Sequence, residues 1–283
     1  MKSKISFYIP AFNSENTIVA SIKSIYEQTI LPDEVIVVDD CSSDNTNNLI
    51  KTNFPEIKLI ENKKNMGLGY SRNTAIKNCE NELIASIDSD VELNKNWIEN
   101  LLNEFENKNN VMCGGKMTEK FIRNKVNKWR SKYYSQNWGQ KKIVNPAFLF
   151  GCNTIILKSK WKSVQGYDDK LFTNGEDIDF SSKIKNMEES NNIIYQPAAE
   201  CYHLQDDNIS SLSKRVWRYH SYGYKIKKPS LKKFVNLSIK QIRFFLFRFF
   251  ENIFKLEFEN IKISFFVLKN FIKLEFENYN SNK

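Results

Sequence analysis

"LIASIDSDVELNKNWI", residues 83–98, is a short apolar run followed at once by two aspartates, Asp88 and Asp90. An apolar run that does not alternate with polar residues is typical of a strand covered on both faces. Two like charges one residue apart then stand at the end of this strand. A single D-x-D is often only a polar loop, so its meaning depends on the other strands of the chain.

The first third of the chain alternates between predicted strands and helices. The stretches "KISFYIP" (4–10) and "EVIVVDD" (34–40) are strand-like, and the residues between them (14–28) place isoleucines on one face of a helix. The remaining predicted elements are a helix at 46–52, a strand at 57–60 and a helix at 70–78. Strands alternating with helices in this way predict a mostly parallel sheet of right-handed βαβ units.

Polar groups follow three of these predicted strands. The first strand runs into Pro10 and Asn13, the second ends in Asp40, and the fourth ends in Asp88 and Asp90. In open sheets of this kind, ligands bind at the carboxyl ends of the strands. We therefore expect the three strand ends to converge on one edge of the sheet and to form a site there.

The second half is less regular, with a strand predicted at 147–157 and short strands at 192–195 and 199–202. The stretch "NGEDIDF" (174–180) opens a helix with three acidic residues after a glycine-containing loop. Acidic residues favour helix amino termini on electrostatic grounds alone. One of them is also placed to act as a general base if it comes within reach of a reacting hydroxyl.

The composition excludes several classes of protein. The five cysteines are scattered, without a C-x-x-C motif or a Cys/His cluster, so we expect neither a disulfide framework nor a structural zinc site. The amino terminus reads directly into a strand, so no signal peptide is expected. No stretch approaches about 18 uninterrupted apolar residues, so no transmembrane helix is expected either. These features favour a cytoplasmic protein.

Three chemistries could account for the predicted site. The stretch "GLGYSR" (67–72) begins like a dinucleotide-binding motif, but Arg72 replaces the third glycine and the segment follows the third strand. An aspartate-nucleophile phosphatase would carry its nucleophile on the first strand, whereas the D-x-D aspartates follow the fourth. A divalent cation that holds a diphosphate fits better, because carboxylates suit Mg²⁺ or Mn²⁺ and the substrate phosphates supply further ligands.

Five segments resemble, in order and spacing, the family 2 glycosyltransferases with a GT-A fold. They are "YIPAFN", "VIVVDDCSSDNT", "NMGLGYSRNTAI", "IASIDSDVEL" and "FLFGCNTIILKSKWKSVQGYDDKLFTNGEDIDFSSKI", and they cover about residues 4–205. The resemblance implies an α/β protein with a Rossmann-like, mostly parallel sheet flanked by helices. It also implies inverting transfer of a sugar from a nucleotide-diphosphate donor, with Mn²⁺ or Mg²⁺ as cofactor.

The resemblance further implies roles for particular residues. On the donor side, Pro10 lies against the nucleoside, Asp40 bonds the base, and Arg72 lies near the uracil or diphosphate. Asp88 contacts the ribose or the donor sugar, and Asp90 ligates the metal.

On the acceptor side, Asp177 matches the catalytic base of the family. His203 falls where many relatives place an additional metal ligand, although a structural histidine is an open alternative. The supporting residues that the resemblance implies are Glu176, Asp179, Gly151 and Asn153.

The predicted organisation is a glycosyltransferase domain at 1–215, with a nucleotide-binding half (1–92) and an acceptor half (93–215), and a helical extension at 216–283. The Q-x-x-R-W segment of processive members is absent from "KRVWRYHSYG" (214–223), which favours addition of a single sugar to a hydroxyl acceptor. The acceptor is expected to be a glycan or a lipid-linked saccharide of the cell envelope. Two alternatives remain open: a catalytically silent subunit that binds nucleotide or membrane, and a GT-A-like nucleotidyltransferase.

The basic character of the chain belongs to its carboxyl-terminal part. Residues 225–283 carry +8 of the net charge of +9, and "FKLEFEN" (254–260) returns as "IKLEFEN" (272–278). At helical spacing, one apolar stripe with lysines to one side is predicted, consisting of Phe254, Phe258, Ile261, Phe265, Leu268, Ile272 and Phe276. Such a helix is expected to lie on an anionic membrane surface, at the inner face of the cell membrane. Packing against the catalytic domain or a second copy is the alternative, and nucleic-acid binding is not expected.

Overall fold

The computed structural model of the chain describes residues 4–187, 191–221 and 230–281. They form two compact units, the first of Met1–Lys120 and Gln136–Gln205 and the second of Phe121–Ser135 and Asp206–Lys283. The predicted boundary between residues 215 and 216 differs from this division. It falls inside helix α8 (Ile209–Ser221), which buries Leu212 and Val216, on either side of that boundary, in one apolar cluster of the second unit.

The first unit is built on one mixed sheet. Within the described residues the sheet has nine strands in the order β3-β2-β1-β4-β8-β6-β9-β5, with β7 paired to β9. Their bounds are β1 (Ile5–Ala11), β2 (Glu34–Asp39), β3 (Lys58–Glu61), β4 (Leu83–Ile87), β5 (Val91–Leu93), β6 (Asn110–Glu119), β7 (Ile143–Val144), β8 (Asn153–Leu157) and β9 (Asn192–His203).

The direction of the strands changes once the sheet passes β4. Strands β3, β2, β1 and β4 are mutually parallel, as the sequence predicts. Strand β8 is antiparallel to both β4 and β6, whereas β6 and β9 run parallel to each other. The parallel half therefore brings the ends of β1, β2 and β4 together at one edge.

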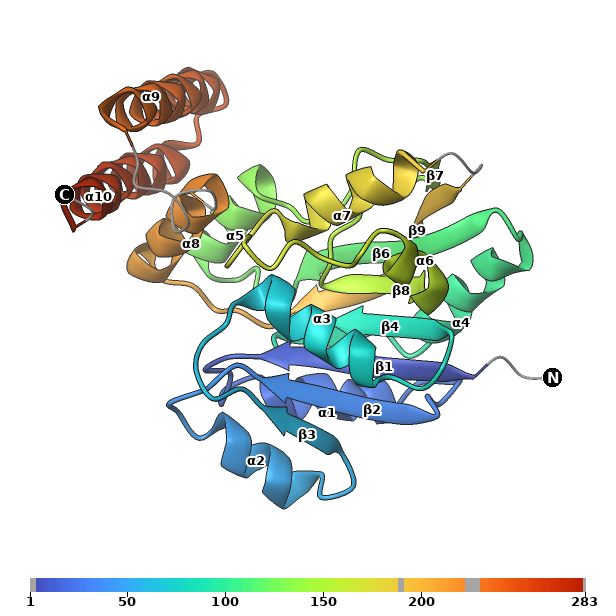
Figure 1. The fold of residues 1–283 in the computed structure, drawn as a ribbon. Coiled ribbons are helices and arrows are strands. Elements are labelled where there is room, and N and C mark those ends of the chain that lie inside the picture. Colours follow the sequence, from blue (N-terminus) through green and yellow to red (C-terminus); the bar gives the residue numbers. More distant parts are fainter. Residues whose placement is uncertain (1–3, 188–190, 222–229, 282–283) are drawn as a thin grey trace. The chain divides into compact units, whose positions relative to one another are not determined.

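Helices cover both faces of this sheet (Figure 1), where α1 and α3 lie on opposite sides of β1. One apolar cluster contains residues of α1, α2 and α4, and the other contains residues of α3, α6 and α7. The bounds are α1 (Ile18–Tyr26), α2 (Thr46–Asn53), α3 (Leu68–Asn78), α4 (Trp97–Leu102), the 3₁₀ helix η1 (Asn103–Glu106), α6 (Lys158–Ser163) and α7 (Glu176–Lys185).

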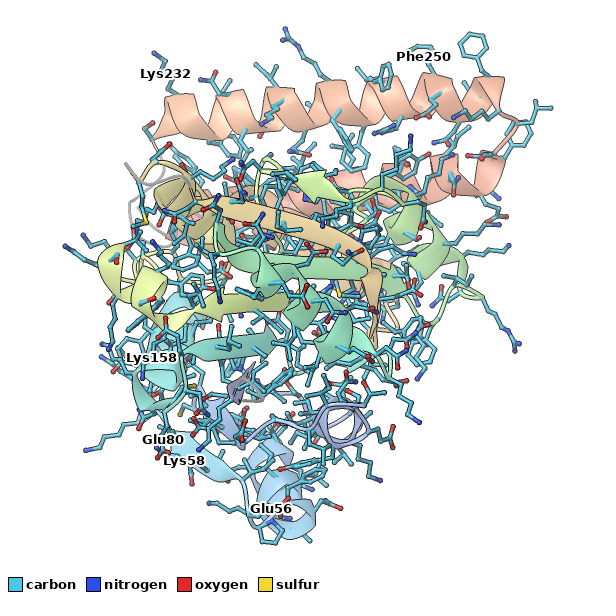
Figure 2. The ribbon with its side chains drawn as sticks, turned by 90° about the vertical axis from the view of Figure 1, so that its right-hand side faces the viewer. Glu56, Lys58, Glu80, Lys158, Lys232 and Phe250 are labelled. Atoms are coloured by element: carbon cyan, nitrogen blue, oxygen red, sulfur yellow. The ribbon has the colours of Figure 1, made fainter. Side chains whose placement is uncertain are left out.

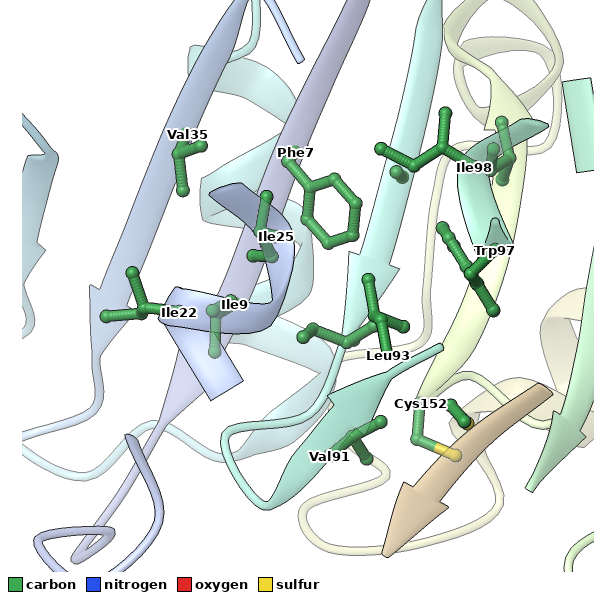
Figure 3. Close-up of a cluster of buried hydrophobic side chains, with 14 of the residues drawn as sticks. Phe7, Ile9, Ile22, Ile25, Val35, Val91, Leu93, Trp97, Ile98 and Cys152 are labelled. Carbon is green, nitrogen blue, oxygen red and sulfur yellow. The ribbon is translucent and has the colours of Figure 1, made fainter. Parts of the chain in front are cut away.

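The strands divide their side chains between the two clusters with a period of two. In β2, Val35 and Val37 belong to the first cluster, whereas Ile36 and Val38 belong to the second. This is the alternation that a pleated strand imposes when both of its faces are covered. Figure 3 shows the first cluster, in which isoleucines of α1 and Trp97 of α4 lie beside side chains from the strands.

Several features of the second half differ from prediction, and β7, α5 (Lys125–Tyr133) and α6 are among the elements that were not predicted. Strand β8 begins only at Asn153, because the carbonyl and amide groups of Gly151 bond side chains and are not available for a strand ladder. The two short strands predicted after residue 192 are one strand, β9, with an irregularity opposite Gly115 and Lys116. Strand β6 was not predicted.

The second unit is helical. It contains α5 (Lys125–Tyr133), α8, α9 (Leu231–Phe254) and α10 (Phe258–Ser281). Trp129 of α5 lies at the centre of its apolar cluster, where it stacks on Phe245 with ring centroids 6.2 Å apart and donates a hydrogen bond to the Ser264 hydroxyl over 2.9 Å. Helices from distant parts of the sequence thus share one core.

The two sequence repeats do not lie on one helix. Helix α9 ends at Phe254, and Leu256 adopts a left-handed backbone conformation with φ of 56° before α10 begins at Phe258. The first repeat therefore forms the turn, and the second lies within α10. The predicted apolar stripe exists from Phe258 to Phe276 but does not include Phe254.

Candidate active site

The strand ends of the parallel half meet at one edge of the sheet. Pro10 lies in β1 beside the end of β2, Asp40 follows β2, and the two D-x-D aspartates follow β4. The hydroxyl groups of Ser14 and Ser89 are 2.6 Å apart and join the loops after β1 and β4. The convergence that the sequence predicts is therefore present.

Asp40 organises the loop that precedes α3. One carboxylate oxygen accepts hydrogen bonds from the Met66 amide over 2.9 Å and from the Asn62 side chain over 2.7 Å, and the other accepts from the Gly67 amide over 2.8 Å. Gly67 has φ of 94°, and a Cβ there would lie 2.7 Å from Phe172. Asp40 itself is 5% exposed. The structure therefore gives Asp40 a role in shaping the loop, and its contact with a base stays a prediction.

Arg72 is enclosed by the protein, with 1% of its surface exposed. Its Nη1 donates to the Ser86 hydroxyl and to the Gly151 carbonyl, each over 2.9 Å. Its Nη2 donates to Asp88 over 2.8 Å, and its Nε lies 3.4 Å from Glu176. One guanidinium therefore ties together α3, the end of β4, the loop before β8 and the start of α7.

Gly151 connects this guanidinium to Asp177. The Gly151 carbonyl accepts from Arg72, and the Gly151 amide donates to Oδ2 of Asp177 over 3.2 Å. The other oxygen of Asp177 accepts from the Ile178 amide over 2.8 Å. A Cβ on Gly151 would lie 3.2 Å from both Arg72 and Asp177, so the close approach of these groups favours glycine at this position.

Burial and neighbouring charges together shift the pKa values of Glu176, Asp177 and Arg72. Burial raises the pKa of Glu176 to about 8, an effect that Asp177 increases and Arg72 opposes. Burial also raises the pKa of Asp177 above its usual value, although the Gly151 amide and Arg72 act in the opposite direction. For Arg72, burial alone would lower the pKa, but Asp88, Tyr8 and Glu176 raise it well above the usual value. The guanidinium is therefore the permanent charge around which the carboxyl groups are arranged.

A second cluster contains Asp90 and His203. Nε2 of His203 lies 3.3 Å from Oδ2 of Asp90, and Nδ1 lies 3.0 Å from Glu119. Gln205 donates to the same Asp90 oxygen over 2.9 Å. Strand pairing places these groups together, because His203 of β9 is in register with Val91 of β5 and with Glu119 of β6. Burial would lower the pKa of His203, but Asp90 and Glu119 raise it.

The Asp90–His203 pair offers two ligands of types that bind Mn²⁺. Glu119 holds the far ring nitrogen of His203, which is the outer-sphere arrangement that orients metal-binding histidines. Among the described residues, no group of three or more His, Cys, Asp or Glu side chains is arranged to hold a metal ion. The pair therefore fits a cation that takes its remaining ligands from a substrate, as Mg²⁺ commonly does.

Two predicted supporting residues have other surroundings. Asn153 is 1% exposed, and its Oδ1 accepts from the indole N–H of Trp97, so it belongs to the packing of the sheet. Asp179 pairs with Lys183 one helical turn later on α7, with 2.7 Å between the charged atoms. Neither interaction directs the side chain toward Asp88 or Asp177.

Glu119 and Gln205 were not predicted as site residues. Glu119 ends strand β6, which local sequence patterns do not indicate, and Gln205 follows β9 as a single polar residue. Their positions depend on strand pairing between distant parts of the chain, which no local pattern reveals. Ser86 was missed for a different reason, since it is a small residue inside an apolar strand.

Known proteins resemble this chain in sequence. Residues 6–164 match the family model described as glycosyl transferase family 2. A chondroitin synthase of Escherichia coli is 27% identical over 186 residues, which cover 65% of this chain and 26% of that protein. The UDP-Glc:alpha-D-GlcNAc-diphosphoundecaprenol beta-1,3-glucosyltransferase WfgD of Escherichia coli is 40% identical over 99 residues, which cover 35% of this chain and 38% of that protein. The chain thus spans well under half the length of these two relatives.

Similarity to a solved structure extends over both units. The crystal structure of S. aureus TarS 1–349 in complex with UDP has a TM-score of 0.59 and 18% sequence identity, and the likeness covers 99% of this chain and 92% of that one. At this level of identity the likeness concerns the fold alone. It confirms the predicted α/β fold class of GT-A type with carboxyl-terminal helices.

Proposed function

Because the chain belongs to glycosyl transferase family 2, we propose that it transfers a single sugar, with inversion, from a nucleotide-diphosphate donor to a hydroxyl group of an acceptor. The observation that carries this proposal is the line of contacts from Asp88 through Arg72 and Gly151 to Asp177. One buried guanidinium holds both a carboxylate of the D-x-D pair and the peptide group that bonds a second carboxylate. This arrangement suits a reaction in which a donor and a general base must be held in a fixed relation.

Asp177 is the proposed base. Its carboxylate is half-buried, and two backbone amides orient it. Burial raises its pKa, which brings the carboxylate closer in basicity to the hydroxyl that it must deprotonate. In the proposed step the acceptor oxygen forms a bond to the anomeric carbon while the bond from that carbon to the diphosphate oxygen breaks. The proton of the acceptor hydroxyl passes to Asp177, and the bonding electrons leave with the nucleoside diphosphate.

Arg72 is the proposed positioning residue of this site. Its predicted contact with the donor stays a prediction. An indirect role is proposed beside it, because its hydrogen-bond donors are directed to Ser86, Gly151 and Asp88. A planar guanidinium with donors in a fixed fork suits this task better than a lysine ammonium would. In this role, Arg72 holds Asp88 toward the donor and holds the Gly151 peptide against Asp177.

Metal dependence is part of the proposal. Asp90 and His203 are the proposed ligands, supported by their 3.3 Å approach and by the Glu119 carboxylate behind the ring. A bound Mn²⁺ or Mg²⁺ would offset the negative charge of the donor diphosphate and of the departing nucleotide. Asp90→Ala is expected to abolish the dependence of donor binding on Mn²⁺, and His203→Ala to weaken it. Donor binding that is unaffected by EDTA would contradict the metal proposal.

The proposed acceptor is a glycan or a lipid-linked saccharide of the cell envelope. It is supported by the name of the WfgD relative, whose acceptor is a diphosphoundecaprenol-linked sugar. None of the described helices is both long enough and apolar enough to cross a lipid bilayer. Work at the inner surface of the cell membrane, and a homodimer formed through the carboxyl-terminal helices, stay predictions.

Release of UDP from UDP-sugars by the purified protein in the presence of Mn²⁺ tests the proposed function. A panel of nucleotide-sugars, first screened for thermal stabilisation of the protein, identifies the donor to use. Asp177→Asn is the matched variant, since it keeps the size of the side chain and removes the base. We expect the wild-type protein to release UDP and the variant to bind the same donor with little release. Donor stabilisation without turnover in the wild-type protein would favour a silent binding subunit, and release of pyrophosphate from a nucleoside triphosphate would favour a nucleotidyltransferase.

A further inference from the structure

Helix α9 has two faces with different surroundings. The inner face packs within the second unit, where Phe245 is 3% exposed and stacks on Trp129, and Gln241 and Asn252 are buried. At the start of the helix, Phe234 stacks on Tyr279 of α10 with ring centroids 5.3 Å apart. These contacts fix which side of α9 faces its own unit.

A second side of α9, about a quarter turn round the helix from the inner face, carries an apolar surface in solvent. Eight large apolar side chains lie there, at intervals of three or four residues apart from the adjacent pair Phe249 and Phe250, and each is at least 38% exposed. We call them the outward stripe: Leu231, Val235, Ile239, Ile242, Leu246, Phe249, Phe250 and Ile253. The spacing keeps them on one side of the helix over its length of about 36 Å.

Much of this apolar surface is left in solvent by the packing of the unit. Scattered apolar residues on a protein surface are ordinary, but a contiguous apolar patch bordered by polar residues marks a binding surface. The stripe meets this description, because Lys232, Lys240 and Arg243 are exposed along one flank of it. Figure 2 shows Lys232 and Phe250 near opposite ends of α9, on the side that is turned away from α10.

The charges of α9 select an anionic partner. Glu251 is the only acidic residue of the helix, and it is paired with Arg248 at 2.7 Å and with Lys255 at 2.8 Å. Two copies packed through their outward stripes would bring several basic residues together with no unpaired acid of α9 to balance them. A surface of anionic lipid headgroups offers that balance.

The shape of the apolar surface also fits a lipid interface. A helix with an apolar face, basic residues beside it and too many charges to span a bilayer lies in the boundary between headgroups and acyl chains. The described helices include none that could span. We propose that α9 binds anionic membrane surfaces through its outward stripe, with the stripe in the interface and Lys232, Lys240 and Arg243 at the lipid phosphates.

Helix α10 provides a contrast within the same unit. Phe265 and Phe276 are 64% and 54% exposed, but the charges near them are of both signs. Lys273 lies 3.8 Å from Glu277, and Glu259 lies 3.4 Å from Lys125. The stripe predicted from the sequence repeats is therefore the weaker candidate, and its residues serve as a matched control.

Co-sedimentation of the full chain with vesicles tests the proposal. The vesicles are of phosphatidylcholine, with or without phosphatidylglycerol, at low and high salt. We expect the wild-type chain to pellet only with the phosphatidylglycerol vesicles, and less so at high salt. Leu246→Glu combined with Phe250→Glu should lower the partition coefficient by at least about tenfold, because it places two carboxylates in the interface.

The control is Phe265→Glu combined with Phe276→Glu, which introduces two carboxylates at residues of α10 with similar exposure. It should leave vesicle binding within about twofold of the wild-type value. Lys240→Glu combined with Arg243→Glu should weaken binding without altering the apolar stripe, and circular dichroism checks that every variant is folded. Equal binding by the α9 and α10 double variants would overturn the proposal, as would a wild-type chain that stays in the supernatant.

Self-association is measured on the same proteins by sedimentation velocity without lipid. A dimer that the Leu246 and Phe250 substitutions dissociate would identify a second copy as the partner of the stripe and would also overturn the proposal. Lipid binding does not depend on the proposed sugar transfer, because release of UDP from a soluble donor is measured separately. The α9 variants should keep that activity, so failure of one proposal is distinguishable from failure of the other.

Discussion

In the first unit the guanidinium of Arg72 is 1% exposed, whereas in the second unit eight large apolar side chains of α9 stay in solvent. Both regions reverse the usual distribution, in which charges face water and apolar groups face the core. They differ in what compensates for the reversal. Around Arg72 the partners are present in the chain, since Asp88, Ser86 and Gly151 accept its hydrogen bonds. Along α9, none of the described residues covers the outward stripe fully, since each of its side chains is at least 38% exposed.

This difference separates two kinds of functional surface. A buried charge is stable only when its partners are already in place, so such a network is rigid and suits the positioning of reacting groups. An exposed apolar face gains its stabilisation only when something else covers it, so it suits binding. The two regions should therefore respond differently to substitution.

The largest effect is expected at Arg72. Arg72→Met keeps much of the side-chain volume and leaves Asp88 without its cation, so the free energy of unfolding should fall by about 3 kcal/mol or more. Chemical denaturation monitored by circular dichroism measures it. Arg72→Lys is the control, because it retains the charge but cannot bond Ser86, Gly151 and Asp88 at once. A loss below about 1 kcal/mol in Arg72→Met would contradict a rigid network.

Asp177→Asn should act on the reaction rather than on the fold. Loss of a general base lowers turnover by about 10²-fold or more, whereas donor affinity and thermal stability should change little. Initial rates with saturating donor and acceptor measure the turnover, and titration with donor measures the affinity. Near-normal turnover would remove Asp177 from the role of base.

The pH dependence of stability should reflect Glu176. Its pKa is raised from 4.5 to about 8. Between these two values the folded protein holds a proton that the unfolded chain has released, so the free energy of unfolding falls as the pH rises, by at most about 1.4 kcal/mol per pH unit. Glu176→Gln removes this titration and should flatten the decline. Asp177 titrates in the same sense, so some decline remains. Parallel curves of the free energy of unfolding against pH for the wild-type protein and the Glu176→Gln variant would contradict the raised pKa of Glu176.

The smallest effect is expected on the outward stripe. Leu246→Ser should change the free energy of unfolding by no more than about 0.5 kcal/mol in the absence of lipid, because the side chain is already in solvent. The neighbouring Phe245 is the matched control, since it is buried and Phe245→Ala should cost about 3 kcal/mol or more. Urea denaturation of both variants measures the contrast. A large loss in Leu246→Ser would mean that the stripe packs within the protein.

Much of the first half of the fold follows from local patterns. The apolar runs of β1, β2 and β4, with the helices between them, predict a parallel sheet, because a strand covered on both faces has a characteristic composition whatever its neighbours are. The same reasoning places Asp40 and the D-x-D aspartates at one edge. The motifs then single out Asp177 and His203, which the structure brings to Gly151 and Asp90 respectively.

Tertiary structure alone decided the rest. Whether Arg72 touches the donor or the interior depends on the loop before β8 and the start of α7, which lie far from it in sequence. Glu119 and Gln205 reach the Asp90–His203 pair only through strand pairing across similar separations. In the second unit the repeats favour a stripe on α10, but a left-handed residue at Leu256 ends α9 and the packing of Phe245 on Trp129 fixes its rotation. Helical periodicity shows that a helix has two faces, and only the contacts with the rest of the unit determine which face remains in solvent.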